Sequence, residues 1–291
     1  METSELLKKV RKIEIKTKGL SSQIFSGEYH SAFKGRGMTF SEVREYQHND
    51  DIRFIDWNVT ARFNHPFVKV FHEERELVVI LLVDVSASGI FGSKGMLKKD
   101  LITELCAVLS FSAITNNDKI GVIFFSDTIE KFIPPKKGKS HILRIIRELL
   151  NFEPSSNKTN ISQALQYLSQ VIKKRSISFV ISDFIDRNYE KELRLAARRH
   201  DLVAVRLSDV IDKEIPDLGL SKFIDPESGK TMWVDLSDDQ NRMLYKKIAL
   251  QQKQMQDEWF LKSGVDCVDL MTHENYVQPL MNFFKKRMSA R

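Results

Sequence analysis

The stretch Val78–Ser88, read as VVILLVDVSAS, decides the fold class of this chain. Its first six residues, Val78 to Val83, are all apolar and rich in β-branched types, with no polar alternation. Such a run is typical of a strand that is buried on both faces of a parallel sheet. Asp84 ends the run, and the carboxyl ends of strands are where ligands bind in α/β sheets.

The polar residues that follow this strand alternate along the chain. Asp84, Ser86 and Ser88 occupy every second position, so in an extended chain their side chains point the same way. One carboxylate and two hydroxyls form a hard oxygen cluster that suits a divalent ion such as Mg²⁺. Asp and Ser are also ordinary turn and helix-cap residues, so the triplet alone leaves a purely structural interpretation open.

Further apolar runs that predict buried strands alternate along the chain with amphipathic segments that predict helices. The order predicts an α/β fold with a doubly wound, mostly parallel sheet and right-handed crossovers. Thr128–Ile133 alternates and then meets Pro134 and Pro135, which predicts a short edge strand. The remaining predicted strands are 119–125, 177–181, 202–207 and 265–270, and the predicted helices are 97–115, 140–150, 161–172, 190–199 and 273–286.

The amino-acid composition differs in two regions from that of the alternating predicted strands and helices. We expect an N-terminal region over residues 1–76 that packs on a main domain over 77–291, with an insertion at about 209–263. The insertion is predicted to hold a hairpin around Pro226–Gly229 and a long helix before the last strand. Residues 1–18 have the spacing of an amphipathic helix.

Length and composition indicate a soluble globular protein. The chain has 291 residues, 42% of them hydrophobic, which is enough to bury a core. We find no apolar run that could cross a bilayer and no signal-peptide core at the N-terminus, so we expect a cytoplasmic protein without membrane insertion. Cys106 and Cys267 lie far apart in apolar contexts, and we interpret both as buried free thiols.

The net charge of +6 raises the question of nucleic acid. Basic residues in the N-terminal region are interleaved with acids, as in REYQHNDDIRFIDW, which predicts internal ion pairs rather than phosphate contacts. Short basic runs such as KKRMSAR are usually solvated, so we expect no nucleic-acid partner. The arginines predicted to pair are Arg44, Arg53 and Arg62, with acids among Glu45, Asp50, Asp51, Asp56, Glu73 and Glu74.

Two more polar residues fall at the same predicted sheet edge as Asp84. Asp183 follows a buried strand in FVISDF, and Thr159 precedes a helix for which Asn160 is a possible N-cap. If these strands are neighbours, the five residues supply three hydroxyls and two carboxylates to one crevice. The set is Asp84, Ser86, Ser88, Thr159 and Asp183.

Those five residues resemble the metal-ion-dependent adhesion site of von Willebrand factor type A domains, with its pattern Asp-x-Ser-x-Ser, then Thr, then Asp. The upstream segment GRGMTFSEVREYQHNDDIRFIDWNVTAR resembles the signature of the bacterial domain-of-unknown-function family fifty-eight. Members of that family are similar to von Willebrand A proteins and are commonly encoded beside MoxR-type AAA+ ATPases. Gly89 departs from the Met that the family usually has, but that side chain is not an oxygen ligand.

The expected function is metal-dependent protein binding. Neutral hydroxyl ligands leave positive charge on Mg²⁺ (or Mn²⁺ or Ca²⁺), so the ion can accept an acidic side chain from a partner. The resemblance implies that the partner is a MoxR-type AAA+ ATPase or its client, with this chain as an adaptor or co-chaperone. The alternative is a phosphoryl-transfer enzyme or phosphatase that uses Asp84 as nucleophile. A dehalogenase-like phosphatase would need an Asp where Ser86 stands, so we expect no enzyme.

Overall fold

The computed structural model describes residues 38–48, 50–73, 77–86, 97–224 and 231–289. The chain divides into two compact units. Phe33–Leu77 forms the smaller unit, and the larger unit contains Val78–Arg291.

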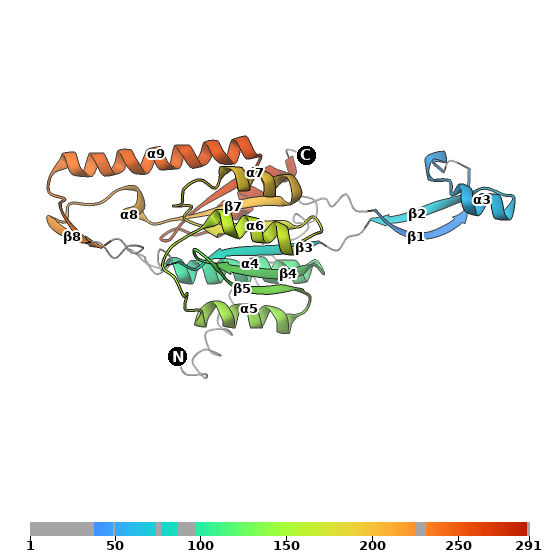
Figure 1. Cartoon of the computed structure of the whole chain (residues 1–291), viewed down its shortest axis with the longest axis horizontal. Coiled ribbons are helices and arrows are strands. Elements are labelled where there is room, and N and C mark those ends of the chain that lie inside the picture. Colours follow the sequence, from blue (N-terminus) through green and yellow to red (C-terminus); the bar gives the residue numbers. More distant parts are fainter. Residues whose placement is uncertain (1–37, 49, 74–76, 87–96, 225–230, 290–291) are drawn as a thin grey trace. The chain divides into compact units, whose positions relative to one another are not determined.

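A six-stranded sheet organises the larger unit (Figure 1). All neighbouring strands run parallel except the last pair, β4 and β5, which is antiparallel. The strand order confirms the predicted doubly wound, mostly parallel α/β sheet, and it places β3 between β6 and β4. In order across the sheet the strands are β10 (Asp266–Met271), β7 (Asp201–Ser208), β6 (Ile177–Ser182), β3 (Val78–Asp84), β4 (Lys119–Phe125) and β5 (Ile129–Lys136).

Helices cover both faces of this sheet. Ile80 and Leu82 of β3 belong to a core cluster with residues of α6 (Ile161–Val171) and α7 (Glu190–Arg199). On the other face lie α4 (Lys98–Thr115) and α5 (Lys139–Asn151), which pack against each other. Because β3 is buried on both sides, its side chains need no polar alternation, as the sequence pattern predicted.

The segment between β7 and β10 holds the predicted hairpin and long helix. Its elements are α8 (Val210–Lys213), β8 (Leu220–Ile224), β9 (Thr231–Asp235) and α9 (Asp239–Ser263). The predicted turn at Pro226–Gly229 lies outside the described residues. The closing helix α10 (Val277–Ser289) begins at Val277 rather than His273, because the Asn275 side chain caps the Val277 N–H at 3.0 Å.

The edge strand β5 runs further than the sequence predicted. It continues through Pro134 and Pro135 to Lys136, with irregular register against β4. An edge strand tolerates proline because one side of its backbone needs no ladder partner. Gly121 on β4 permits this close approach, since an added Cβ there would lie 2.9 Å from the Pro135 nitrogen.

The smaller unit is an antiparallel pair, β1 (Met38–Glu45) with β2 (Phe67–Glu73), plus the short helices η1 (Ile52–Phe54) and α3 (Trp57–Phe63). Two predicted ion pairs are present: Arg44 binds Asp50 at 2.7 Å and Arg53 binds Asp51 at 2.6 Å. Asp56 instead caps α3, and its carboxylate lies 3.5 Å from the Lys69 ammonium.

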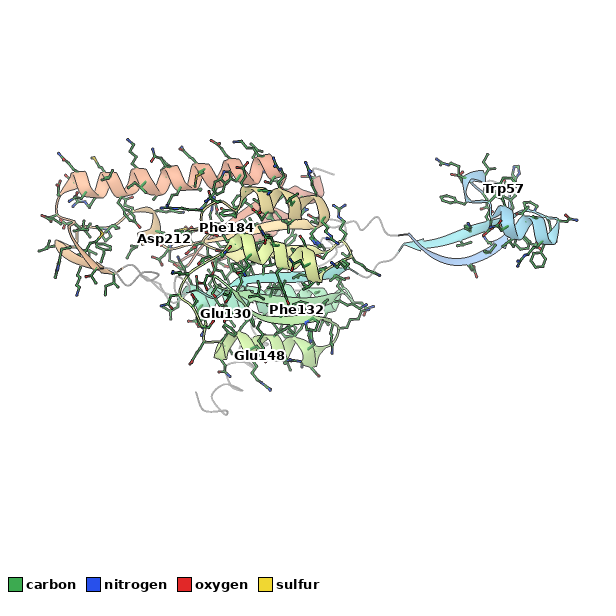
Figure 2. The ribbon with its side chains drawn as sticks, viewed as in Figure 1. Trp57, Glu130, Phe132, Glu148, Phe184 and Asp212 are labelled. Carbon is green, nitrogen blue, oxygen red and sulfur yellow. The ribbon has the colours of Figure 1, made fainter. Side chains whose placement is uncertain are left out.

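Trp57, at the start of α3, is labelled in Figure 2, and its side chain is exposed. The amphipathic helix predicted for residues 1–18 lies outside the described part of the chain. Within that part, no helix combines the length and apolar character that crossing a membrane requires.

Candidate functional site

Asp84 lies at the carboxyl end of β3 with both carboxylate oxygens occupied by hydrogen bonds. The Ser86 N–H donates to Oδ1 at 3.0 Å, and the Ser182 hydroxyl donates to Oδ2 at 2.6 Å. The side chain is nearly inaccessible, since Asp84 is only 4% exposed and Ser86 is buried beside it. The expected grouping of Asp84 with Ser86 is therefore present, and Ser182 joins them from the neighbouring strand.

Asp183 follows β6 at the same edge of the sheet. Its Oδ1 accepts the Ile185 N–H at 3.1 Å, and the Phe184 N–H donates to the Ser182 hydroxyl at 3.0 Å. Phe184 (labelled in Figure 2) has a φ of 59°, a left-handed conformation that is uncommon for a bulky residue. The Asp183 carboxylate lies close enough to Asp84 for the two to interact electrostatically.

A buried lysine for which the sequence carried no signal contacts Asp183. Lys98, the first residue of α4, is 3% exposed. Its ammonium lies 3.4 Å from Asp183 and 2.9 Å from Asp212 on α8. Burial alone would lower the pKa of Lys98, but the two carboxylates raise it above its usual value. Lys98 is thus a charged internal partner of Asp183.

The same surroundings change the acidity of Asp84. Burial, together with the nearby Asp183 carboxylate, raises the pKa of Asp84 to about 6. Hydrogen bonds from Ser182 and Ser86 act in the opposite direction. Keeping the Asp84 carboxylate charged beside Asp183 therefore carries an energetic cost that a cation would relieve.

Thr159 lies in the half-buried loop that enters α6. The adjacent Asn160 N–H donates to the Ser126 carbonyl after β4 at 2.9 Å, and the Ile161 N–H donates to Asp186 after β6 at 2.7 Å. The loop therefore connects the ends of the two strands that flank β3. Asn160 also caps α6 as predicted, accepting the Gln163 N–H at 2.9 Å.

The fifth residue of the expected set, Ser88, lies outside the described residues. Among the residues that are described, no group of three or more His, Cys, Asp or Glu side chains could hold a metal ion. The expected ligand set, three hydroxyls with two carboxylates, is not a group of that kind.

Ser182, Lys98 and Asp212 could not be assigned to the site from the sequence, for different reasons. Ser182 directly precedes Asp183, and the register of β6 beside β3 was the missing information. Lys98 stands in the run LKKD and looks like any solvated lysine at a helix start, while Asp212 lies in the insertion. Neither Lys98 nor Asp212 carries a local signal, because their contact depends on the tertiary fold.

The cysteines contribute no metal ligands to this site. Both are free; Cys106 is buried as expected, whereas Cys267 is only partly buried. Burial raises the pKa of the Cys106 thiol, and it raises the pKa of Cys267 to about 12. Thiols with raised pKa values remain protonated and are poor nucleophiles.

Comparison with known families settles the family membership. Residues 42–255 match the family model described as "Protein of unknown function DUF58". The chain belongs to this family. The match begins in β1 and ends in α9, so it includes residues of both units.

The chain is also similar to individual proteins. The uncharacterized protein Rv1480 of Mycobacterium tuberculosis is 30% identical over 232 residues, which cover 79% of this chain and 73% of the relative. Among solved structures, BatB from Bacteroides thetaiotaomicron has 15% identity and a TM-score of 0.47, covering 74% of this chain and all of that one. The SpRpn10 VWA domain has 11% identity and a TM-score of 0.43, covering 71% of this chain and 94% of that domain.

Proposed function

We propose that this protein is a cytoplasmic, metal-dependent protein-interaction module of the von Willebrand A type, and that it has no enzymatic activity of its own. The resident ion is Mg²⁺, for which Mn²⁺ can substitute. Asp84, Ser86, Ser88, Thr159 and Asp183 hold it directly or through water. The observation that carries the proposal is the buried Asp84, hydrogen-bonded at the carboxyl end of β3 beside Ser86 and close to Asp183.

The charges and ligands around Asp84 fit a divalent cation. Asp84 and Asp183 bring two carboxylates that repel each other, and Lys98 pairs with Asp183 and Asp212. A divalent ion would offset the repulsion between Asp84 and Asp183. The available donors are carboxylate and hydroxyl oxygens, the ligands that Mg²⁺ prefers. The bound ion would supply an open coordination position for an acidic side chain of a partner.

Two features favour an interaction module over a phosphatase. A nucleophilic carboxylate must reach the substrate, but Asp84 is buried; a carboxylate that holds an internal ion or orients its waters needs no such exposure. The position two residues later, where a dehalogenase-like phosphatase would have a second acid, is Ser86. The ion pairs of Arg44 and Arg53 in the smaller unit likewise argue against phosphate binding there.

By family resemblance, the partner is a MoxR-type AAA+ ATPase or a client of that ATPase. In this proposal the protein acts as an adaptor or co-chaperone in the assembly or activation of client proteins. The partner contributes an Asp or Glu side chain to the ion, so binding requires both the metal and Asp84.

A pull-down from native extract tests the proposal. The full chain is used as bait in Mg²⁺, in chelator, and as the Asp84→Ala variant. We expect an AAA+ ATPase or its client to be recovered only with metal and only with Asp84. Equal recovery of the same proteins under all three conditions would show that the ion does not mediate the contact.

A further inference from the structure

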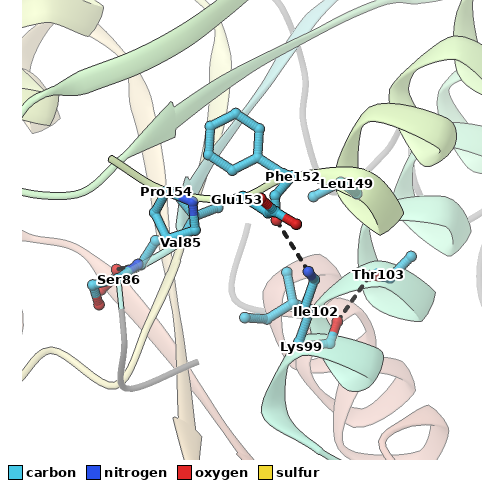
Figure 3. Close-up of a pocket in the computed structure, with 10 residues that line it drawn as sticks. Val85, Ser86, Lys99, Ile102, Thr103, Leu149, Phe152, Glu153 and Pro154 are labelled. Atoms are coloured by element: carbon cyan, nitrogen blue, oxygen red, sulfur yellow. Dashed lines mark hydrogen bonds between the residues drawn. The ribbon is translucent and has the colours of Figure 1, made fainter. Parts of the chain in front are cut away.

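A small apolar pocket adjoins the candidate ion site (Figure 3). Asp84 and Ser86 form one part of its lining, and Ile102, Leu149 and Phe152 contribute a wall of carbon atoms. Its volume is about 120 Å³. An apolar protein cavity of roughly 150 Å³ holds benzene, so this somewhat smaller pocket has room for one apolar side chain of about the size of Leu or Met.

The wall of the pocket is held in place by contacts with the rest of the fold. The Phe152 ring packs against Phe124 of β4 with 4.9 Å between centroids. The Lys99 ammonium donates to the Phe152 carbonyl at 3.0 Å, a bond drawn in Figure 3. Glu130 (labelled in Figure 2) accepts hydrogen bonds from the N–H and hydroxyl of Ser155, just beyond Pro154. The pocket is therefore preformed.

We propose that this pocket receives an apolar side chain of a protein partner, next to the acidic side chain that the same partner places on the ion. The inference rests on the proposed function and deepens it. Asp84 and Ser86 belong to both the pocket and the candidate ion site. Neighbouring Cα atoms in a peptide are about 3.8 Å apart, so two side chains close together in one segment can reach both places.

The charges around the pocket and the pocket volume indicate which side chain it can receive. The ion and Lys99 favour an acidic residue nearby, whereas Glu153 at the pocket disfavours a second acid inside it. The volume is well below the roughly 300–1,000 Å³ of pockets for small-molecule ligands, so a single side chain fits better than a metabolite. Burying one such side chain is expected to raise the affinity of the acidic peptide about 10- to 100-fold.

Selection from a displayed library of random peptides tests this inference without knowledge of the natural partner. The full chain is the target, in Mg²⁺ and in chelator. We expect the Mg²⁺-dependent peptides to share an Asp or Glu with Leu or Met within one or two positions. With Ile102→Trp, which fills the pocket, the acid should persist while the apolar preference disappears.

Two further variants control the comparison. Leu195→Trp adds the same side chain at an exposed position of α7 and should leave the apolar preference intact. Ile102→Phe is a smaller insertion, used in case the Trp variant does not fold. Enrichment of acids without any apolar preference would overturn the pocket inference and leave the proposed function standing. Peptides that bind equally well in chelator would overturn the proposed function and the pocket inference together.

Discussion

Among single residues, the buried charges near Asp84 must be compensated by partners of opposite charge. Asp84 and Asp183 lie close enough to interact electrostatically, and Lys98 contacts only one of them. A buried charge that loses its partner is costly, whereas a hydrogen-bonded and paired one is tolerated. We therefore expect Lys98 to neutralise Asp183 in part, and the proposed ion to neutralise the charge that remains on Asp84 and Asp183.

Replacing Lys98 by Met tests whether Lys98 and the ion each neutralise part of this negative charge. The change leaves Asp183 and Asp212 without their ammonium, so we expect the variant to lose about 3 kcal/mol of stability without metal. Because Mg²⁺ would then relieve more repulsion, it should raise the melting temperature more in the variant than in the wild type. Thermal unfolding with and without Mg²⁺ measures both effects. Adding Asp212→Asn should recover part of the stability, and an equal Mg²⁺ shift in all proteins would contradict the account.

His200 gives the protein a predicted sensitivity to acid. It is buried, its Nδ1 lies 2.9 Å from the Ser176 hydroxyl, and burial lowers its pKa to about 4. The unfolded chain binds a proton near pH 6.5, so the stability from neutral His200 is present above that pH and is lost as the pH falls toward 4. We expect a loss of about 2 kcal/mol between pH 7 and pH 5 from this residue.

Urea unfolding at the two pH values checks the contribution of His200. His200→Gln cannot be protonated, and its stability should fall less between pH 7 and pH 5 than that of the wild type. The same fall in both proteins would assign the acid sensitivity to other groups.

At the scale of elements, α9 supports the loop that carries Asp183. Gln256 on α9 donates to the Phe184 carbonyl at 2.9 Å and accepts from Arg206 of β7 at 2.8 Å. Arg206 also binds Asp269 of β10 at 2.7 Å. The insertion is thus connected to the site by side-chain hydrogen bonds, which no local sequence pattern indicated.

Gln256→Leu tests that support. The variant leaves the Phe184 carbonyl and one Arg206 donor without their partner, so we expect a loss of about 1–3 kcal/mol and weaker Mn²⁺ binding. Gln252→Leu, one turn earlier on an exposed position, is the matched control and should change neither property. Denaturant unfolding and Mn²⁺ titration make the comparison, and identical behaviour of the two variants would exclude a role for α9.

At the scale of the whole molecule, the larger unit contains every strand of the six-stranded sheet. We therefore predict that residues 77–291 fold without the N-terminal region. Circular dichroism should show a cooperative thermal transition for this fragment, and Mn²⁺ should bind it as tightly as it binds the full chain. A fragment that lacks a cooperative transition would mean that the smaller unit is required for folding.

The sequence was informative where a pattern is local and repeated. Buried runs such as Val78–Val83 predicted the strands, and their alternation with helices predicted the parallel sheet. Sequence patterns gave the wrong strand end or the wrong exposure where tertiary contacts outweigh local preferences. Pro134 and Pro135 remain within β5 because Gly121 allows a close edge approach, and Lys98 is buried because two distant carboxylates face it.

A count of bound metal ions tests whether Asp84 belongs to a metal site. Electron paramagnetic resonance of Mn²⁺ titrated into the full chain distinguishes free from bound ions. We predict one bound ion per wild-type chain and, for Asp84→Asn, a loss of affinity of about tenfold or more. Asp127→Asn, which changes an acid in the turn after β4, is the control and should bind like the wild type. No binding by the wild type, or equal binding by Asp84→Asn, would contradict the assignment of Asp84 to a metal site.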